Sequence, residues 1–168
     1  MKLIFIDTCL FIDLCNLHLI NELFQLEQEI HISYEIFNDI DNINKNLICS
    51  NKSFDRLNIH KMGNDSYKDM YEMNYPNYLG HNDKTGLFVA NKVSGLVITT
   101  DSVVCSYLKS IGIEFQGILW IFDMFVSNGI LIKSDAIKKM NNLIETNKIY
   151  QPNLDLTAEA KKRIKLWL

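Results

Sequence analysis

Short apolar runs rich in β-branched and aromatic residues alternate along this chain with segments whose apolar residues recur every three or four positions. The clearest runs are residues 2–6, 30–32 and 96–99, and helical spacing follows each of them. Such a run predicts a buried strand, and the three-to-four spacing predicts an amphipathic helix. Strands that alternate with helices favour a mostly parallel sheet covered on both faces, so we expect a three-layer α/β/α fold.

The other expected elements are less regular. Residues 42–78 are rich in Asn and Lys, and they contain one expected strand at residues 57–60; another short strand is expected at 113–115. The tyrosines of this segment follow at spacings of four, four and three, which predicts one packing stripe on a helix: Tyr67, Tyr71, Tyr75 and Tyr78. Helices are expected at residues 8–28 with a break near Asn16, after an N-cap at Ser33, and at residues 65–73, 82–94, 102–110, 118–127, 135–146 and 157–167.

The chain length and composition predict one domain. A chain of 168 residues buries a substantial core, and we assign residues 1–132 to the domain and residues 133–168 to a helical tail packed on it. No apolar run is long enough to span a membrane, and Asp7 and Asp13 interrupt the apolar start that a signal peptide needs. We therefore expect a cytoplasmic protein whose four cysteines are free and mostly buried thiols, since no metal-binding Cys spacing occurs.

The charge balance restricts the partners. The net charge of −3 argues against a tight, sequence-reading DNA-binding protein, which usually has a basic surface. It argues less against an enzyme with an acidic metal site, because a bound cation reverses the local charge.

Aspartates stand directly after two of the expected strands. Asp7 follows the first strand, Asp101 follows the strand at residues 96–99, and each begins a helix. In a parallel α/β sheet, ligands bind beyond the carboxyl ends of the strands. Either aspartate alone has a simpler interpretation as a helix N-cap, but two of them at one sheet edge favour a shared site.

Further carboxylates accompany this pair. Asp83 stands at the start of an expected helix, where a negative charge is favourable without any other role. Glu35 and Asp39 are four residues apart on the helix after the second strand and share one of its faces, which a solvated surface also explains. Clustered carboxylates raise one another's pKa unless a cation neutralises them, and oxygen ligands suit Mg²⁺ or Mn²⁺. Such ions activate water and stabilise a phosphate under attack, so nuclease is the reaction class we expect.

Four stretches of the chain together resemble the PIN-domain family, especially the small prokaryotic PIN proteins that include VapC-type toxins. Each stretch alone is weak, but their order and spacing over residues 1–132 are more specific. The matching stretches are Ile4-Phe5-Ile6-Asp7-Thr8 with Leu10 to Leu14, Ile32-Ser33 with Asp39 six positions later, Leu79-Gly80-His81-Asn82-Asp83, and Leu96-Val97-Ile98-Thr99-Thr100-Asp101 with Gly112 and Gly117.

The resemblance implies an α/β/α fold, Mg²⁺ or Mn²⁺ dependence and an RNA substrate, single-stranded or structured. Carried over residue by residue, it makes metal ligands or water-positioning groups of Asp7, Asp39, Asp83 and Asp101. Thr8 and Thr100 become nearby polar support, and His81 a candidate phosphate contact that is more commonly a surface residue. The spacing selects Asp39 over Glu35, although the family usually has Glu there, and toxin members usually form homodimers silenced by an antitoxin protein.

Three other functions compete with an RNA-cutting enzyme. The first is a catalytically weak PIN fold that binds RNA or a protein, and the second is a DNase that recognises DNA structure. The third is a haloacid-dehalogenase-like phosphatase, which needs a second aspartate two residues after the first, where this chain has Cys9.

Overall fold

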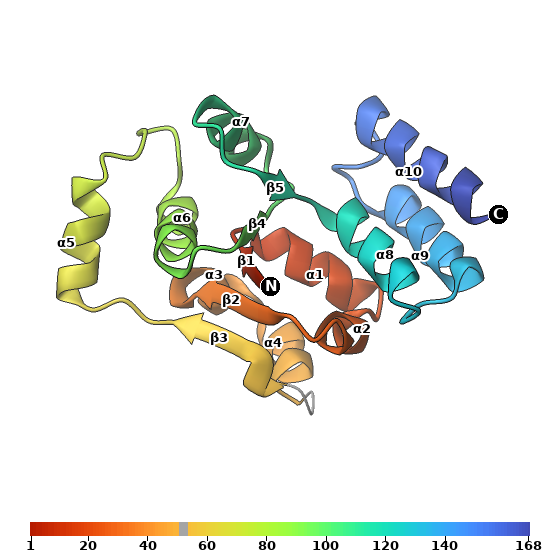
Figure 1. The fold of residues 1–168 in the computed structure, drawn as a ribbon, viewed down its shortest axis with the longest axis horizontal. Helices are drawn as coiled ribbons and strands as arrows, with labels where there is room; N and C mark the ends of the chain where they lie inside the picture. Colours follow the sequence, from red (N-terminus) through yellow and green to blue (C-terminus); the bar gives the residue numbers. More distant parts are fainter. Residues whose placement is uncertain (51–53) are drawn as a thin grey trace.

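The computed structural model describes residues 1–50 and 54–168, and within them a five-stranded, all-parallel sheet forms the centre of the molecule (Figure 1). The strands follow one another across the sheet in the order β3-β2-β1-β4-β5, with helices flanking the sheet. This confirms the predicted α/β class and the parallel sheet. The strands are β1 (Lys2–Phe5), β2 (Glu29–Ser33), β3 (Leu57–His60), β4 (Leu96–Ile98) and β5 (Phe115–Gln116).

The central strand β1 carries the strongest hydrophobic signal because both of its faces are covered. Leu3, Ile4 and Phe5 are completely buried, as expected of an interior strand in a parallel sheet. β1 pairs with β2 on one side and with β4 on the other. The chain therefore builds the sheet outward in one direction from β1 to β3 and in the other from β4 to β5. The β1/β4 boundary is the topological switch point, where α/β sheets bind their ligands.

Helices connect the strands, and helices also form the C-terminal part of the chain (Figure 1). In the figure, α5 and α6 lie at the left of the sheet, and α8, α9 and α10 lie together at the right. The helices are α1 (Thr8–Asn16), α2 (Ile20–Gln25), α3 (Tyr34–Asp39), α4 (Asn42–Cys49), the 3₁₀ turn η1 (Phe54–Arg56), α5 (Asn64–Glu72), α6 (His81–Val93), α7 (Ser102–Ser110), α8 (Ile118–Ser127), α9 (Lys133–Thr146) and α10 (Leu154–Trp167).

Several predicted boundaries are confirmed and others are wrong. The break near Asn16 and the Ser33 N-cap are present, and Ser33 accepts a hydrogen bond from the Ile36 N–H at 3.3 Å. Helix α4 was not predicted. The strand expected at residues 113–115 is wrong in its position, because the Ile113 N–H donates to the Leu108 carbonyl and belongs to the end of α7.

The predicted tyrosine stripe is also wrong. Helix α5 ends at Glu72, and Asn74 adopts a left-handed conformation with φ 49° that turns the chain away. Tyr71 and Tyr78 are 65% and 63% exposed, whereas Tyr75 packs edge-on against Tyr107 in α7. The four rings therefore serve separate parts of the structure.

The C-terminal helices contribute to the same hydrophobic core as the sheet. Met140 and Tyr150 are buried in it, and the Lys139 ammonium donates to the Leu17 carbonyl at 2.5 Å. The division into a domain and a tail stays a prediction. No helix in the described ranges is long and apolar enough to cross a membrane. All four cysteines are free, but the prediction of mostly buried thiols is wrong, because Cys9 and Cys49 are exposed.

Candidate active site

Asp7 is held between two elements at the carboxyl edge of the sheet. As the N-cap of α1, it accepts a hydrogen bond on Oδ1 from the Cys9 N–H at 2.8 Å. Its Oδ2 accepts from the backbone N–H of Thr100 at 3.2 Å and from the Thr100 hydroxyl at 2.5 Å. Thr100 follows β4 and precedes Asp101, so this contact joins the ends of the two strands at the switch point.

Asp101 caps α7 in the same way that Asp7 caps α1. Its Oδ1 accepts from the N–H groups of Val103 at 2.8 Å and Val104 at 2.9 Å. Its own N–H donates to the Thr99 hydroxyl at 3.2 Å. Within residues 1–50 and 54–168 no protein donor reaches its Oδ2, so that oxygen is free to meet a ligand. Helix capping and participation in a site are thus compatible roles.

Asp83 brings a third carboxylate to this edge from the first turn of α6. Its Oδ2 accepts from the Gly80 N–H at 2.8 Å. Burial raises the pKa of the Asp83 carboxyl, and the negative charges of Asp101 and Asp7 raise it further, against the Gly80 hydrogen bond that lowers it. The three carboxylates therefore act on one another electrostatically, although they come from three separate segments.

The two acids of α3 have different partners. Asp39, the last residue of α3, is exposed and accepts a hydrogen bond from the Asn82 amide, one residue before Asp83. Glu35 accepts from the Tyr67 hydroxyl of α5, and its second oxygen, Oε2, is buried without a hydrogen-bond partner. Asp39 is thus tied to the start of α6, whereas Glu35 anchors α5. The sequence showed no sign of either the Asn82 or the Tyr67 contact.

The remaining predicted residues lie around the carboxylates with distinct contacts. The Thr8 hydroxyl donates to the Ile36 carbonyl at 3.4 Å, which ties α1 to α3. Thr100 is the polar residue that contacts Asp7 directly. His81 is exposed and stacks on Tyr67, with ring centroids 6.1 Å apart and planes 16° from parallel.

Comparison with known families decides the affiliation of the chain. The PIN-domain family model matches residues 3–164. The chain belongs to the PIN-domain family. PIN domains are generally nucleases and typically use divalent metal ions. Neither the curated proteins nor the solved structures contained a match to the chain.

The donor set of this PIN domain suits a hard divalent cation in chemistry and charge. Asp7, Asp83 and Asp101 offer oxygen ligands, and the charges of Asp101 and Asp7 contribute, after burial, to the raised pKa of the Asp83 carboxyl. In the described part of the chain, however, no three His, Cys, Asp or Glu side chains converge at metal-ligand positions. The carboxylate oxygens are instead engaged by Thr100, Gly80 and the helix N–H groups.

A partly buried carboxylate of α1, Asp13, has polar contacts that the sequence did not reveal. Asp13, in α1, accepts from the Asn147 amide on both oxygens, at 2.9 and 2.8 Å. Burial raises the pKa of Asp13 from 3.8 to about 6, with a contribution from the charge of Asp7. Tyr150 is 1% exposed, and its hydroxyl has no partner in the described structure. These contacts tie the α9–α10 region to α1, behind Asp7.

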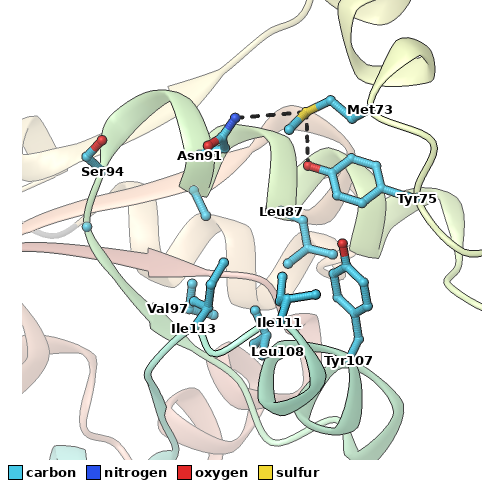
Figure 2. A pocket seen from close by; sticks show the side chains of 12 residues that line it. Met73, Tyr75, Leu87, Asn91, Ser94, Val97, Tyr107, Leu108, Ile111 and Ile113 are labelled. Carbon is cyan, nitrogen blue, oxygen red and sulfur yellow. Dashed lines mark hydrogen bonds between the residues drawn. The ribbon is translucent and has the colours of Figure 1, made fainter.

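An apolar cavity of the PIN domain lies apart from the carboxylates. It has a volume of about 260 Å³, and it lies between the C-terminal ends of α6 and α7 and the start of β4. Figure 2 shows Leu87 and Tyr107 along this cavity, and Met73 accepts a hydrogen bond from Tyr75 at its rim. Asp83 and Asp101 stand at the opposite, N-terminal ends of the same two helices, so this cavity does not belong to the carboxylate site.

Proposed function

We propose that this PIN domain is a metal-dependent endoribonuclease that hydrolyses RNA phosphodiester bonds at the carboxyl edge of β1 and β4. The observation that carries the proposal is the double hydrogen bond from Thr100 to Asp7. It fixes one aspartate against the segment that carries Asp101, at the switch point of the sheet. A strand-end aspartate that only capped its own helix would need no such cross-sheet support.

Asp7, Asp83 and Asp101 are the residues that would hold Mg²⁺ or Mn²⁺, with Asp39 as the fourth acid. Such an ion supplies Lewis-acid activation of water and stabilises charge on the phosphate. The contributions of the chain are orientation and charge. Thr100 and the first N–H groups of α1 and α7 fix the carboxylates of Asp7 and Asp101 before any ligand arrives, which removes a reorganisation cost.

A binding module without catalysis is the second candidate. The observation that favours it is that no three potential ligands converge among the described residues. It predicts RNA binding that is insensitive to chelation and to Asp7→Asn. The phosphatase alternative finds no support, because the residue two after Asp7 is an exposed cysteine whose N–H donates to Asp7.

The proposal extends to a role as the toxin of a toxin–antitoxin pair and to a homodimer. Both rest on the resemblance to small prokaryotic PIN proteins. We propose that the enzyme works in the cytoplasm and that a small antitoxin protein silences it. Light scattering of the purified chain tests the dimer: a mass of twice 19.5 kDa supports it, and a mass of 19.5 kDa at all concentrations contradicts it.

The experiment that tests the enzyme is cleavage of labelled RNA and of labelled single-stranded DNA with Mn²⁺ or Mg²⁺, with and without EDTA. Asp7→Asn and Asp101→Asn are suitable variants because Asn remains a good N-cap, so α1 and α7 keep their first turns. The proposal expects RNA cutting that EDTA and each variant abolish. Cutting that persists in both folded variants, or DNA cut in preference to RNA, contradicts it. RNA binding without cutting supports the binding module.

A further inference from the structure

A second cavity, of about 200 Å³, opens beside the carboxylate edge. Its walls come from the ends of β4 and β5, the first turns of α7 and α8, and the last helix, α10. The residues that line it include Thr99, Thr100, Cys105, Phe115, Gln116, Trp120, Tyr150, Leu156 and Arg163.

Two of the lining residues, Thr100 and Cys105, connect the cavity to the proposed active site. Thr100 lines the cavity and donates its hydroxyl to Asp7. Cys105 lies one turn into α7 after Asp101; burial raises the pKa of its thiol, and the charges of Asp101 and Asp7 raise it further, against the charge of Lys109. Through Thr100, one wall of the cavity is thus in direct contact with the Asp7 carboxylate.

The walls of the cavity are apolar, and aromatic rings are among them. Phe115 and Trp120 supply aromatic rings, and Leu119 and Leu156 supply aliphatic surface. Aromatic faces of this kind bind nucleobases by stacking, whatever the base sequence.

Polar groups on the cavity walls are available to hydrogen-bond with the edge of a nucleobase. Within the described residues, the Gln116 amide and the Trp120 indole N–H make no hydrogen bond to protein, and the buried Tyr150 hydroxyl has no partner. A base edge offers both donors and acceptors to such groups.

The charges around the cavity favour an uncharged ring inside it and a phosphate outside. The Arg163 guanidinium is neutralised by Asp123, at 2.8 Å, and by Glu159, at 3.4 Å. The Lys109 ammonium lies 5.9 Å from the centroid of the Phe115 ring, on exposed helix surface. Among the described residues, the interior thus offers no unpaired positive charge to bind a phosphate group. The Lys109 ammonium, on the surface outside the cavity, is placed to contact the phosphate backbone of the RNA.

We propose that this cavity is a nucleobase subsite that takes one unstacked base of single-stranded RNA beside the bond to be cut, with Trp120 as its stacking face. This inference rests on the proposed nuclease function and names its substrate class. A base inside a duplex is paired and stacked, so only single strands, loops or bulges present one to the cavity. The C-terminal helices α8 and α10 then have a role in substrate selection.

The test uses Trp120 as its own reporter. In an Asp101→Asn/Trp167→Phe background, the protein binds without cutting and Trp120 is its single tryptophan, because the chain has two. A short single-stranded RNA is expected to quench the Trp120 fluorescence, and the same RNA annealed to its complement is expected to leave it unchanged. Equal quenching by both, or no quenching by a single strand that binds, overturns the subsite.

Substitutions give a second, independent readout by fluorescence anisotropy of the labelled RNA. In the Asp101→Asn protein, Trp120→Ala is expected to weaken single-strand binding by on the order of tenfold, and Trp120→Phe to restore most of it. Leu166→Ala, on exposed surface of α10, is the matched control and is expected to change nothing. Should Trp120→Ala fold poorly, Gln116→Ala replaces it; made in the otherwise wild-type, cleaving protein, it is expected to alter the base preference at the cut. Unchanged affinity of Trp120→Ala in the Asp101→Asn protein, or an unchanged cutting pattern of Gln116→Ala in the cleaving protein, overturns the subsite and leaves the nuclease itself standing. Absence of metal-dependent cutting by the wild-type protein overturns the nuclease.

Discussion

Thr100 donates both its backbone N–H and its hydroxyl to the same carboxylate oxygen of Asp7, across 93 positions of sequence. Two donors on one oxygen fix the orientation of that carboxylate, and hydrogen bonds to charged groups are among the stronger ones in proteins. Because Asp101 is the next residue, the same contact fixes the spacing between the two strand-end aspartates.

Removing the hydroxyl of Thr100 should therefore impair activity more than folding. We expect Thr100→Val to lower the cleavage rate by about ten- to hundredfold, the equivalent of one hydrogen bond to a charged group. Thr100→Ser keeps the hydroxyl and should retain most activity. Single-turnover cleavage, with thermal melts to verify folding, measures both. Equal activity of the Val and Ser variants contradicts the orienting role.

The two acids of α3 should separate in their effects. Asp39 is linked through Asn82 to the start of α6, whereas Glu35 is bonded to Tyr67. We expect Asp39→Asn to lower cleavage by about tenfold or more, as loss of a ligand does, and Glu35→Gln to leave cleavage nearly unchanged. Cleavage assays at several Mn²⁺ concentrations compare the two. A greater loss in Glu35→Gln would identify Glu35 as the second acid of the site.

The close approach of α6 to the sheet depends on Gly86. A Cβ atom at this position would lie 2.7 Å from Cγ2 of Ile6 and 2.9 Å from Cδ1 of Ile36, so the helix would have to move. We expect Gly86→Ala to lower the free energy of unfolding by about 1–3 kcal/mol, as overpacked cores do, despite the better helix propensity of Ala. Gly63→Ala is the control, since a Cβ there meets nothing within 4 Å. Urea unfolding measures both, and equal losses would contradict the account.

The partly buried Asp13 should make stability depend on pH. Its carboxyl has a pKa of about 6 in the folded protein, against an ordinary value of 3.8. The folded chain thus holds more protons than the unfolded chain between those values, and the free energy of unfolding falls as pH rises through this window. Outside the window this group contributes no pH dependence. In Asp13→Asn the contribution is absent.

The measurement that checks this is urea unfolding of the wild type and of Asp13→Asn at about pH 4 and about pH 7.5. EDTA is present in both, so that metal binding does not contribute to the stability. The wild type should lose stability relative to Asp13→Asn on going to the higher pH. A constant difference between the two proteins would show that Asp13 is not held protonated by its surroundings.

Much of the fold followed from local signals. The β1, β4, α7 and α8 segments have strong apolar periodicity and clear end residues, such as Asp101 before α7 and Asn128-Gly129 after α8. The positions of Asp7 and Asp101 at one edge followed from the general behaviour of parallel sheets.

Other features depend on contacts between distant residues, which no local pattern records. The polar segment of α4 has little apolar periodicity, and only the Asp41 cap marks its start. Tyr67 reaches Glu35 and Asn147 reaches Asp13 across 32 and 134 positions. The cavity beside Trp120 is completed by Leu156 and Arg163 of α10, and the place of that helix is set by tertiary packing.

The most direct test of the account is Mn²⁺ binding, followed by electron paramagnetic resonance of the free ion or by calorimetry, in the wild type and in Asp7→Asn, Asp83→Asn and Asp101→Asn. Shared coordination predicts that each single substitution weakens binding by on the order of ten- to hundredfold, with Lys68→Ala on the exposed face of α5 as an unaffected control. The same affinity in all the folded proteins would contradict a common metal site at the carboxyl edge of β1 and β4.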